Sequence, residues 1–154
     1  GMAGELGHMT IVPDGRACGC GNTGCLEMYA SSRGIVTAYG EECSGQPAKP
    51  VTSEQVYRAA RQGEEAALRA MRRMGSFLGI GIANLINIFN PEMIVVGGGV
   101  RDAWDLFIGA TLDEVRKRAF AYPAERTRIV PSLLGDDAGM VGAATAAFQL
   151  AENH

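Results

Sequence analysis

Three cysteines and a glutamate stand together in one short segment, Cys18-Gly19-Cys20-Gly21-Asn22-Thr23-Gly24-Cys25-Leu26-Glu27. A histidine, His8, precedes this segment by ten residues. Three thiolates and one imidazole make a complete tetrahedral ligand set for Zn²⁺. The glycines and Asn22 suit the tight backbone turns that such a loop requires. The sequence therefore predicts a closed, structural zinc site in a loop over residues 8–25, with His8, Cys18, Cys20 and Cys25 as ligands.

The C-x-C-x4-C spacing differs from that of common zinc ribbons and fingers, so by itself it indicates a metal but not a family. The alternative interpretation is three incidental buried cysteines. A fourth cysteine, Cys43, lies in a polar segment with no evident partner, and we expect it to be a free thiol.

Two glutamates flank the expected metal site. Glu5 precedes His8 by three residues, and Glu27 follows Cys25 by two. If one ring nitrogen of His8 binds zinc, the other carries a proton that can be donated to a ligand. Each carboxylate can accept hydrogen bonds from two hydroxyl groups. Glu5, His8 and Glu27 therefore suit a polyhydroxylated ligand, unless the glutamates are merely solvated or only support the zinc ligands.

The composition is that of a globular protein and argues against two classes of partner. The chain has 154 residues, enough for one domain with a core, and 47% of them are hydrophobic. Its net charge of −3 argues against binding to nucleic acid. The most apolar run, residues 77–89, is shorter than the roughly 20 residues that span a bilayer. Clustered cysteines without a signal peptide favour the reducing cytoplasm.

Hydrophobic periodicity predicts an α/β chain that is rich in helix and has few strands. We expect an extended run at 9–12, strands at 93–96 and 128–131, and helices at about 26–39, 52–62, 64–89, 104–120 and 138–151.

The second half of the long helix, residues 77–89, is apolar on nearly all sides and is expected to be buried. Gly75, Gly79 and Gly81 would weaken an exposed helix, so we expect them to admit another helix or backbone. Gly97-Gly98-Gly99 directly follows the first strand. That triple-glycine turn could receive a nucleotide or sugar, or it could be a tight turn without a ligand.

These segments together resemble the ROK family, which groups sugar kinases, chiefly glucokinases, with sugar-responsive repressors. The two most specific patterns are G-E-x-G-H at residues 4–8 and C-x-C-G-x-x-G-C-x-E at residues 18–27. The other matching segments are 13–15, 82–92, 97–99, 134–139 and 142–144.

The resemblance implies the C-terminal domain of an actin-like (ribonuclease H-like) ATPase and sugar kinase fold, in which two α/β domains clasp sugar and ATP. It implies that His8, Cys18, Cys20 and Cys25 bind zinc and that Glu5, His8 and Glu27 contact a hexose. It also implies that Gly97 and Gly98, with the segment 137–139, lie towards the adenine nucleotide. The implied cofactors are structural Zn²⁺ and, in the complete enzyme, MgATP.

Parts of the family pattern have no counterpart here. Family members are about twice as long, and their D-x-G-x-T phosphate motif, second phosphate loop and catalytic aspartate are missing. Phosphoryl transfer depends on positioning and on neutralising charge at the γ-phosphate. We therefore expect residues 1–154 to be a single, truncated domain without a catalytic residue and inactive alone. Gly1-Met2 resembles a tag remnant before an initiator methionine, so a late gene start, a short gene and proteolysis all stay open.

Two other functions stay open beside a partial glucokinase-like kinase. One is the effector-binding half of a repressor, whose DNA-binding region would lie outside this chain. The other is a non-catalytic remnant that binds sugar weakly or only self-associates. Truncation would expose one flank of the sheet and the apolar face around 77–89, so we expect a homo-oligomer. The sequence does not choose among glucose, mannose, N-acetylglucosamine, N-acetylmannosamine and allose.

Overall fold

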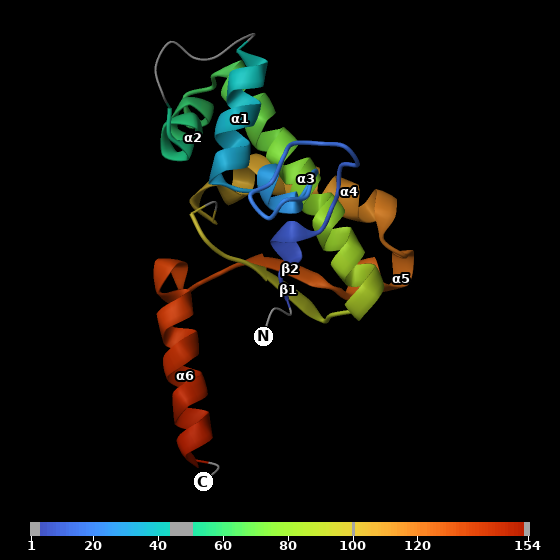
Figure 1. The fold of residues 1–154 in the computed structure, drawn as a ribbon, viewed down its shortest axis with the longest axis vertical. Helices are drawn as coiled ribbons and strands as arrows, with labels where there is room; N and C mark the ends of the chain where they lie inside the picture. The colour runs from blue at the N-terminus through green and yellow to red at the C-terminus, as the bar shows by residue number, and fades with distance from the viewer. Residues whose placement is uncertain (1–3, 44–50, 100, 153–154) are drawn as a thin grey trace.

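A computed structural model describes residues 4–43, 51–99 and 101–152 and shows a helical body packed on one side of a small sheet (Figure 1). The α-helices are α1 (Ser32–Glu42), α2 (Ser53–Arg61), α3 (Glu65–Phe89), α4 (Trp104–Arg118), α5 (Ala121–Arg126) and α6 (Ala138–Glu152). Short 3-10 helices lie at Leu6–His8, Leu26–Met28, Arg101–Ala103 and Gly135–Asp137. The strands β1 (Met93–Val96) and β2 (Arg128–Pro131) lie where the sequence predicted them.

The two strands pair in parallel, with Met93 opposite Arg128 and Val96 opposite Pro131. One face of the sheet packs its apolar side chains against α3 and α4; the core there contains Ile82, Ile86, Val115, Ile94, Val96 and Ile129. On the other face, Met93 and Val95 are 45% and 53% exposed. Parallel sheets are usually covered on both faces. The described part of the chain therefore leaves one apolar sheet face uncovered.

Helices α3 and α4 approach each other at two glycines. A Cβ atom at Gly75 would lie 2.5 Å from the carbonyl oxygen of Phe107, and one at Gly79 would lie 2.5 Å from that of Thr111. Thr111 Oγ1 donates a buried hydrogen bond of 2.9 Å to the Gly75 carbonyl. Gly81 similarly admits the side chain of Leu26. The predicted close approach of another helix is confirmed at Gly75 and Gly79, whereas at Gly81 the neighbour is a side chain.

The predicted helix at 26–39 is wrong, because the chain breaks it into two. A 3-10 turn covers Leu26–Met28, and α1 starts only at Ser32. Ser31 is extended, with φ −149° and ψ 174°, and its side chain accepts a hydrogen bond from the backbone N–H of Gly34. Ser31 thus acts as an N-cap. The break lets the segment that carries Glu27 follow the metal loop rather than the axis of α1.

Burial of the whole run 77–89 is also wrong. Ile88 and Phe89 are 67% and 66% exposed, although Ile82 and Ile86 are buried. The helix ends at Asn90, whose φ of 45° is left-handed, and Pro91 prevents its continuation. The end of α3 therefore extends past the helices that cover its middle.

Two smaller differences from the prediction concern residues 104–120 and 9–12. The helix predicted at 104–120 stops at Arg118, and α5 follows it as a separate helix. Residues 9–12 form no strand; Thr10 makes only an isolated antiparallel bridge with Cys25.

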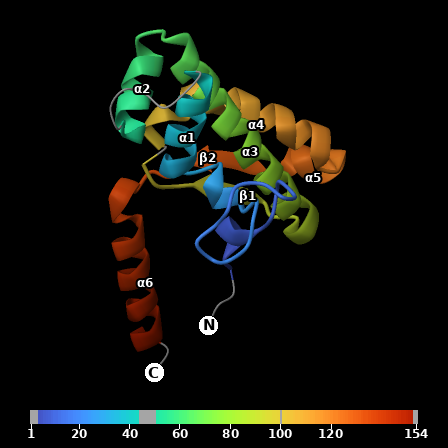
Figure 2. The same cartoon turned by 45° about the horizontal axis from the view of Figure 1, so that its top comes forward.

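Helix α6 projects from the body, as Figures 1 and 2 show, and its Met140 and Phe148 are exposed. Among the described residues, no helix combines the length and apolar character that a membrane span requires.

The close contact at Gly79 predicts opposite effects for two glycine-to-alanine changes. Gly79→Ala places a methyl group against backbone atoms of α4 and should lower the free energy of unfolding by about 1–3 kcal/mol. Gly109→Ala, in α4 with open space around it, should raise it by up to about 1 kcal/mol. Urea denaturation measures both variants. Equal effects would contradict the helix contact described here.

Candidate metal centre and sugar-binding surface

The chain between His8 and Glu27 folds back on itself through backbone hydrogen bonds. The N–H groups of Ile11 and Leu26 donate to the carbonyls of Gly24 and Met9, each at 2.9 Å. Gly24 has a φ of 73°, and a Cβ there would lie 1.7 Å from the carbonyl oxygen of Val12. Only glycine fits at such a crossing. This local crossing brings both ends of the loop together.

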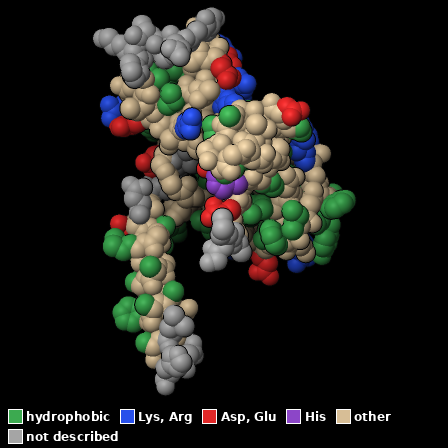
Figure 3. Space-filling model, viewed as in Figure 1, with side chains coloured by type: hydrophobic (Ala, Val, Ile, Leu, Met, Phe, Trp, Pro, Cys, Tyr) green, Lys and Arg blue, Asp and Glu red, His purple; other side chains and the backbone are tan. Residues whose placement is uncertain are grey.

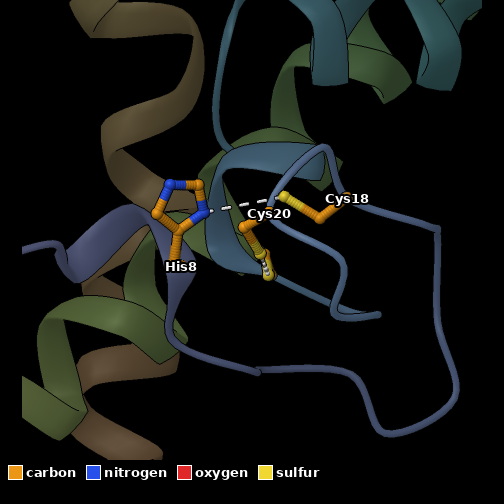
Figure 4. Close-up of side chains that lie close together, drawn as sticks. His8, Cys18 and Cys20 are labelled. Carbon is orange, nitrogen blue, oxygen red and sulfur yellow. Dashed lines mark hydrogen bonds between the residues drawn. The ribbon is translucent and has the colours of Figure 1, made fainter.

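The four predicted ligands meet at this crossing. His8 Nδ1 lies 3.6 Å from Cys18 Sγ, and Cys20 Sγ lies 3.7 Å from Cys25 Sγ. Figure 4 shows the side chains of His8, Cys18 and Cys20 converging. All four ligand atoms lie within 4.8 Å of one another. Cys18 and Cys25 are buried, whereas Cys20 is exposed.

The spacing of these atoms fits tetrahedral coordination. Bonds of about 2.3 Å to sulfur and about 2.0–2.1 Å to nitrogen would place two sulfurs about 3.8 Å apart and a sulfur and nitrogen about 3.5–3.6 Å apart. The observed separations of 3.7 and 3.6 Å agree with both values. The His8, Cys18, Cys20 and Cys25 cluster could therefore hold a metal ion of this kind.

The hydrogen bonds around the cluster shift the pKa values of the Cys18 and Cys20 thiols in opposite directions. The backbone N–H of Cys20 lowers the pKa of Cys18, but the Glu27 carboxylate, burial and the other thiols together raise it to about 12. The Cys18 thiol donates to Glu27 Oε1 at 2.9 Å. The backbone N–H of Asn22 is the main cause of the lowered pKa of Cys20. A bound cation would compete with the proton of Cys18, because the thiolate is the ligand.

The three predicted sugar contacts lie together on the open side of the cluster. His8 Nε2 faces Glu5 Oε2 at 3.9 Å, and His8 Nδ1 lies 3.6 Å from Glu27 Oε1. The side chains of Glu5, His8 and Glu27 are 64%, 36% and 44% exposed. In Figure 3 the purple histidine lies at the surface with red carboxylate atoms beside it. The arrangement offers one N–H donor and two carboxylates to a ligand.

Helix α3 packs against the segments that carry this surface. Phe77 packs against Tyr29 with ring centroids 4.5 Å apart, and Asn84 Nδ2 lies 3.4 Å from Met9 Sδ. The sequence reasoning missed Tyr29 and also Arg16, whose guanidinium lies 4.6 Å from the centre of the Tyr29 ring. No local pattern singles out either residue, because their partners lie elsewhere in the chain.

The triple-glycine turn borders a cavity whose lining includes none of the four residues of the metal cluster. Gly98 has a φ of 82°, which glycine adopts without strain. A cavity of about 300 Å³ lies between the turn and the helices α1, α2 and α3. Its lining residues are Ser32, Ile35, Ser53, Glu54, Tyr57, Met71, Gly99, Asp102 and Ala103. Gly99 thus reaches the cavity, whereas the predicted nucleotide contacts Gly97 and Gly98 are not among its lining residues.

Cys43 is an exposed free thiol, as predicted. It lies outside the metal cluster.

Comparison with known proteins identifies the family. The family model for the ROK family matches residues 1–149. The chain belongs to the ROK family. A glucokinase of Halalkalibacterium halodurans is 37% identical over 92% of this ROK chain and 46% of its own length. A putative xylose repressor of Caldicellulosiruptor sp. is 36% identical over 92% of this chain and 38% of its own length.

A solved structure gives the same family and the fold. The ROK glucokinase of Streptomyces griseus, in complex with glucose and AMPPNP, superposes with a TM-score of 0.81 at 33% identity. The match covers 96% of this ROK chain and 52% of that one. The expected actin-like fold is confirmed, and the described residues form a region rich in helix with two strands. The chain spans about half the length of the curated relatives it matches.

The cluster geometry predicts which cysteines a metal needs. Cys25→Ser should lose bound zinc and become much less stable, because structural zinc contributes on the order of 10 kcal/mol to folding. Cys43→Ser is the matched control and should keep both properties. Elemental analysis and thermal unfolding measure the two effects. A reduced, folded wild-type protein that neither contains nor takes up zinc would contradict the assignment.

Proposed function

We propose that residues 1–154 form the C-terminal, zinc- and sugar-binding part of a cytoplasmic, ATP-dependent hexose kinase of the glucokinase type. The observation that carries this proposal is the convergence of Glu5, His8 and Glu27 beside the Cys18, Cys20 and Cys25 cluster. His8 would then serve both parts of the site, because it would bind the ion and also contact the sugar.

The chemistry of this surface suits sugar hydroxyls. If zinc binds His8 through Nδ1, the proton resides on Nε2, which faces the side of Glu5. That N–H can donate to a hydroxyl oxygen, while the carboxylates of Glu5 and Glu27 accept from hydroxyl protons. Zinc would also fix the orientation of the His8 imidazole ring. The glucose bound to the glucokinase of Streptomyces griseus supports a hexose as the ligand class.

The nucleotide is proposed to lie towards Gly97 and Gly98, at the end of β1. Support comes from the backbone of this turn and from the 300 Å³ cavity beside Gly99. The AMPPNP complex of the Streptomyces griseus glucokinase supports a nucleotide in a protein of this fold. MgATP would be the phosphoryl donor of the complete enzyme. No catalytic residue is assigned to this chain, so phosphoryl transfer requires groups from elsewhere.

Self-association is a further part of the proposal. The end of α3 and the neighbouring α5 region expose large apolar side chains, which are Ile88, Phe89, Phe120 and Tyr122. Each is at least 66% exposed, and such surface favours association.

The repressor relatives favour a second candidate function. The putative xylose repressor of Caldicellulosiruptor sp. matches the same share of this chain, 92%, as the glucokinase of Halalkalibacterium halodurans. In a repressor, the same surface would bind a sugar as an effector without phosphorylating it. The coding sequence upstream of Met2 separates the two, since D-x-G-x-T favours a kinase and a helix-turn-helix favours a repressor.

The proposal predicts activity only when the upstream coding sequence is included. The longer product should form hexose 6-phosphate from ATP and glucose in a coupled assay free of host kinases, whereas residues 1–154 should not. Glu27→Gln in the longer product should raise KM for the sugar, because a carboxylate acceptor is lost.

Asp113→Asn, on the exposed surface of α4, is the matched control for loss of one carboxylate and should leave KM unchanged. Phosphorylation of glucose by residues 1–154 alone would overturn the proposal that phosphoryl transfer requires groups outside these residues. A longer product that binds sugar and DNA without forming a sugar phosphate would favour the repressor.

A further inference from the structure

Arg16 lies in the metal loop, between His8 and Cys18, and its side chain turns inward. Only 18% of that side chain is exposed, although arginine usually lies in solvent. Its backbone also links the two sides of the loop, because the Arg16 carbonyl accepts a hydrogen bond from the Gly24 N–H at 2.8 Å. An inward-turned arginine in a loop this short requires partners for its charge.

Three of its contacts are made with the segment that follows Glu27. Arg16 Nη1 donates to the Met28 carbonyl at 2.8 Å, and the Arg16 backbone N–H donates to the Tyr29 hydroxyl at 2.7 Å. The guanidinium also lies 4.6 Å from the centre of the Tyr29 ring, a cation–π distance. Tyr29 is 5% exposed, so these contacts are shielded from water. They fix the loop against the turn that presents Glu27.

The remaining contact ties the guanidinium to α1. Arg16 Nη2 donates to Glu41 Oε1 at 2.7 Å, and Arg73 of α3 pairs with the other oxygen of Glu41 at 2.7 Å. Partial burial raises the pKa of Glu41, but Arg16 and Arg73 outweigh it and lower the pKa overall. Glu41 therefore remains an anion that holds Arg16 in place.

We propose that Arg16 is a positioning residue, which holds the metal loop and Glu27 in their binding geometry before any ion is present. This inference rests on the proposed zinc and sugar site. A loop already folded loses less conformational entropy when its four ligands close on an ion, so binding is tighter. Lysine cannot replace Arg16 fully, because one ammonium cannot span Met28, Glu41 and the Tyr29 face as a planar guanidinium does.

The test compares Arg16→Ala and Arg16→Lys with Arg69→Ala. Arg69→Ala is the matched control, because it also removes an ion pair between α3 and α1, but Arg69 pairs with Glu42 and Glu65 rather than with Glu41. Zinc affinity is measured by competition with a chromophoric chelator. Arg16→Ala should bind zinc about 10- to 100-fold more weakly, as changes around metal ligands do. Arg16→Lys should fall between Arg16→Ala and wild type, and Arg69→Ala should match wild type.

A second measurement does not depend on the metal. Hydrogen exchange of the zinc-free proteins should be faster over residues 17–29 in Arg16→Ala than in wild type or Arg69→Ala. Exchange over α4 should be the same in all three, which also checks that the variant is folded. If Arg16→Ala proves unfolded, Arg16→Lys carries both measurements.

The outcomes separate this inference from the proposed function. If wild type binds zinc and Arg16→Ala binds it equally well, with equal exchange, the inference about Arg16 is wrong. If wild type does not bind zinc, the proposed site is wrong, and unchanged exchange in Arg16→Ala would then overturn the positioning role as well. Faster exchange confined to residues 17–29 supports the positioning role in either case.

Discussion

The close packing of α3 is the constraint on which the rest of this structure depends. Gly75 and Gly79 let α4 approach its backbone, and the buried hydrogen bond from Thr111 fixes the contact. On the same helix, Phe77, between the two glycines, packs against Tyr29 of the metal-loop region, and Ile86, further along, packs against the sheet. One helix thus supports both the proposed sugar surface and the strand that leads to the triple-glycine turn. A larger side chain at either glycine would disturb both regions together.

The metal loop is held by two sets of interactions that differ in kind. The cluster of His8 and three cysteines closes the loop through side chains that an ion would draw together. Arg16 fastens the same loop to Tyr29 and Glu41 through charge and hydrogen bonds. The side-chain contacts of Arg16 are with Met28, Tyr29 and Glu41 rather than Glu27, whose side chain is 44% exposed. Arg16 and its partners therefore hold the loop in place, while Glu5, His8 and Glu27 stay accessible to a ligand.

Local patterns explain which features the sequence could predict. The ligands of the metal loop lie within eighteen residues of one another, and the strands 93–96 and 128–131 are short apolar runs, so both can be recognised from local sequence alone. The break before α1 depends on whether Ser31 or the continuing helix satisfies the Gly34 N–H, which periodicity does not reveal. Burial of Phe89 depends on what covers the end of α3, and the role of Arg16 depends on Glu41, twenty-five residues away. Long-range packing decides these features.

The central claim is that His8 and three cysteines bind one zinc ion and thereby present Glu5 and Glu27 to a sugar. X-ray absorption at the zinc edge tests its foundation most directly, since it reports the elements bound to the ion. The account predicts three sulfur ligands at about 2.3 Å and one nitrogen at about 2.0 Å, with the nitrogen lost in His8→Ala. A coordination shell of oxygen and nitrogen alone, or a nitrogen that persists in His8→Ala, would contradict it.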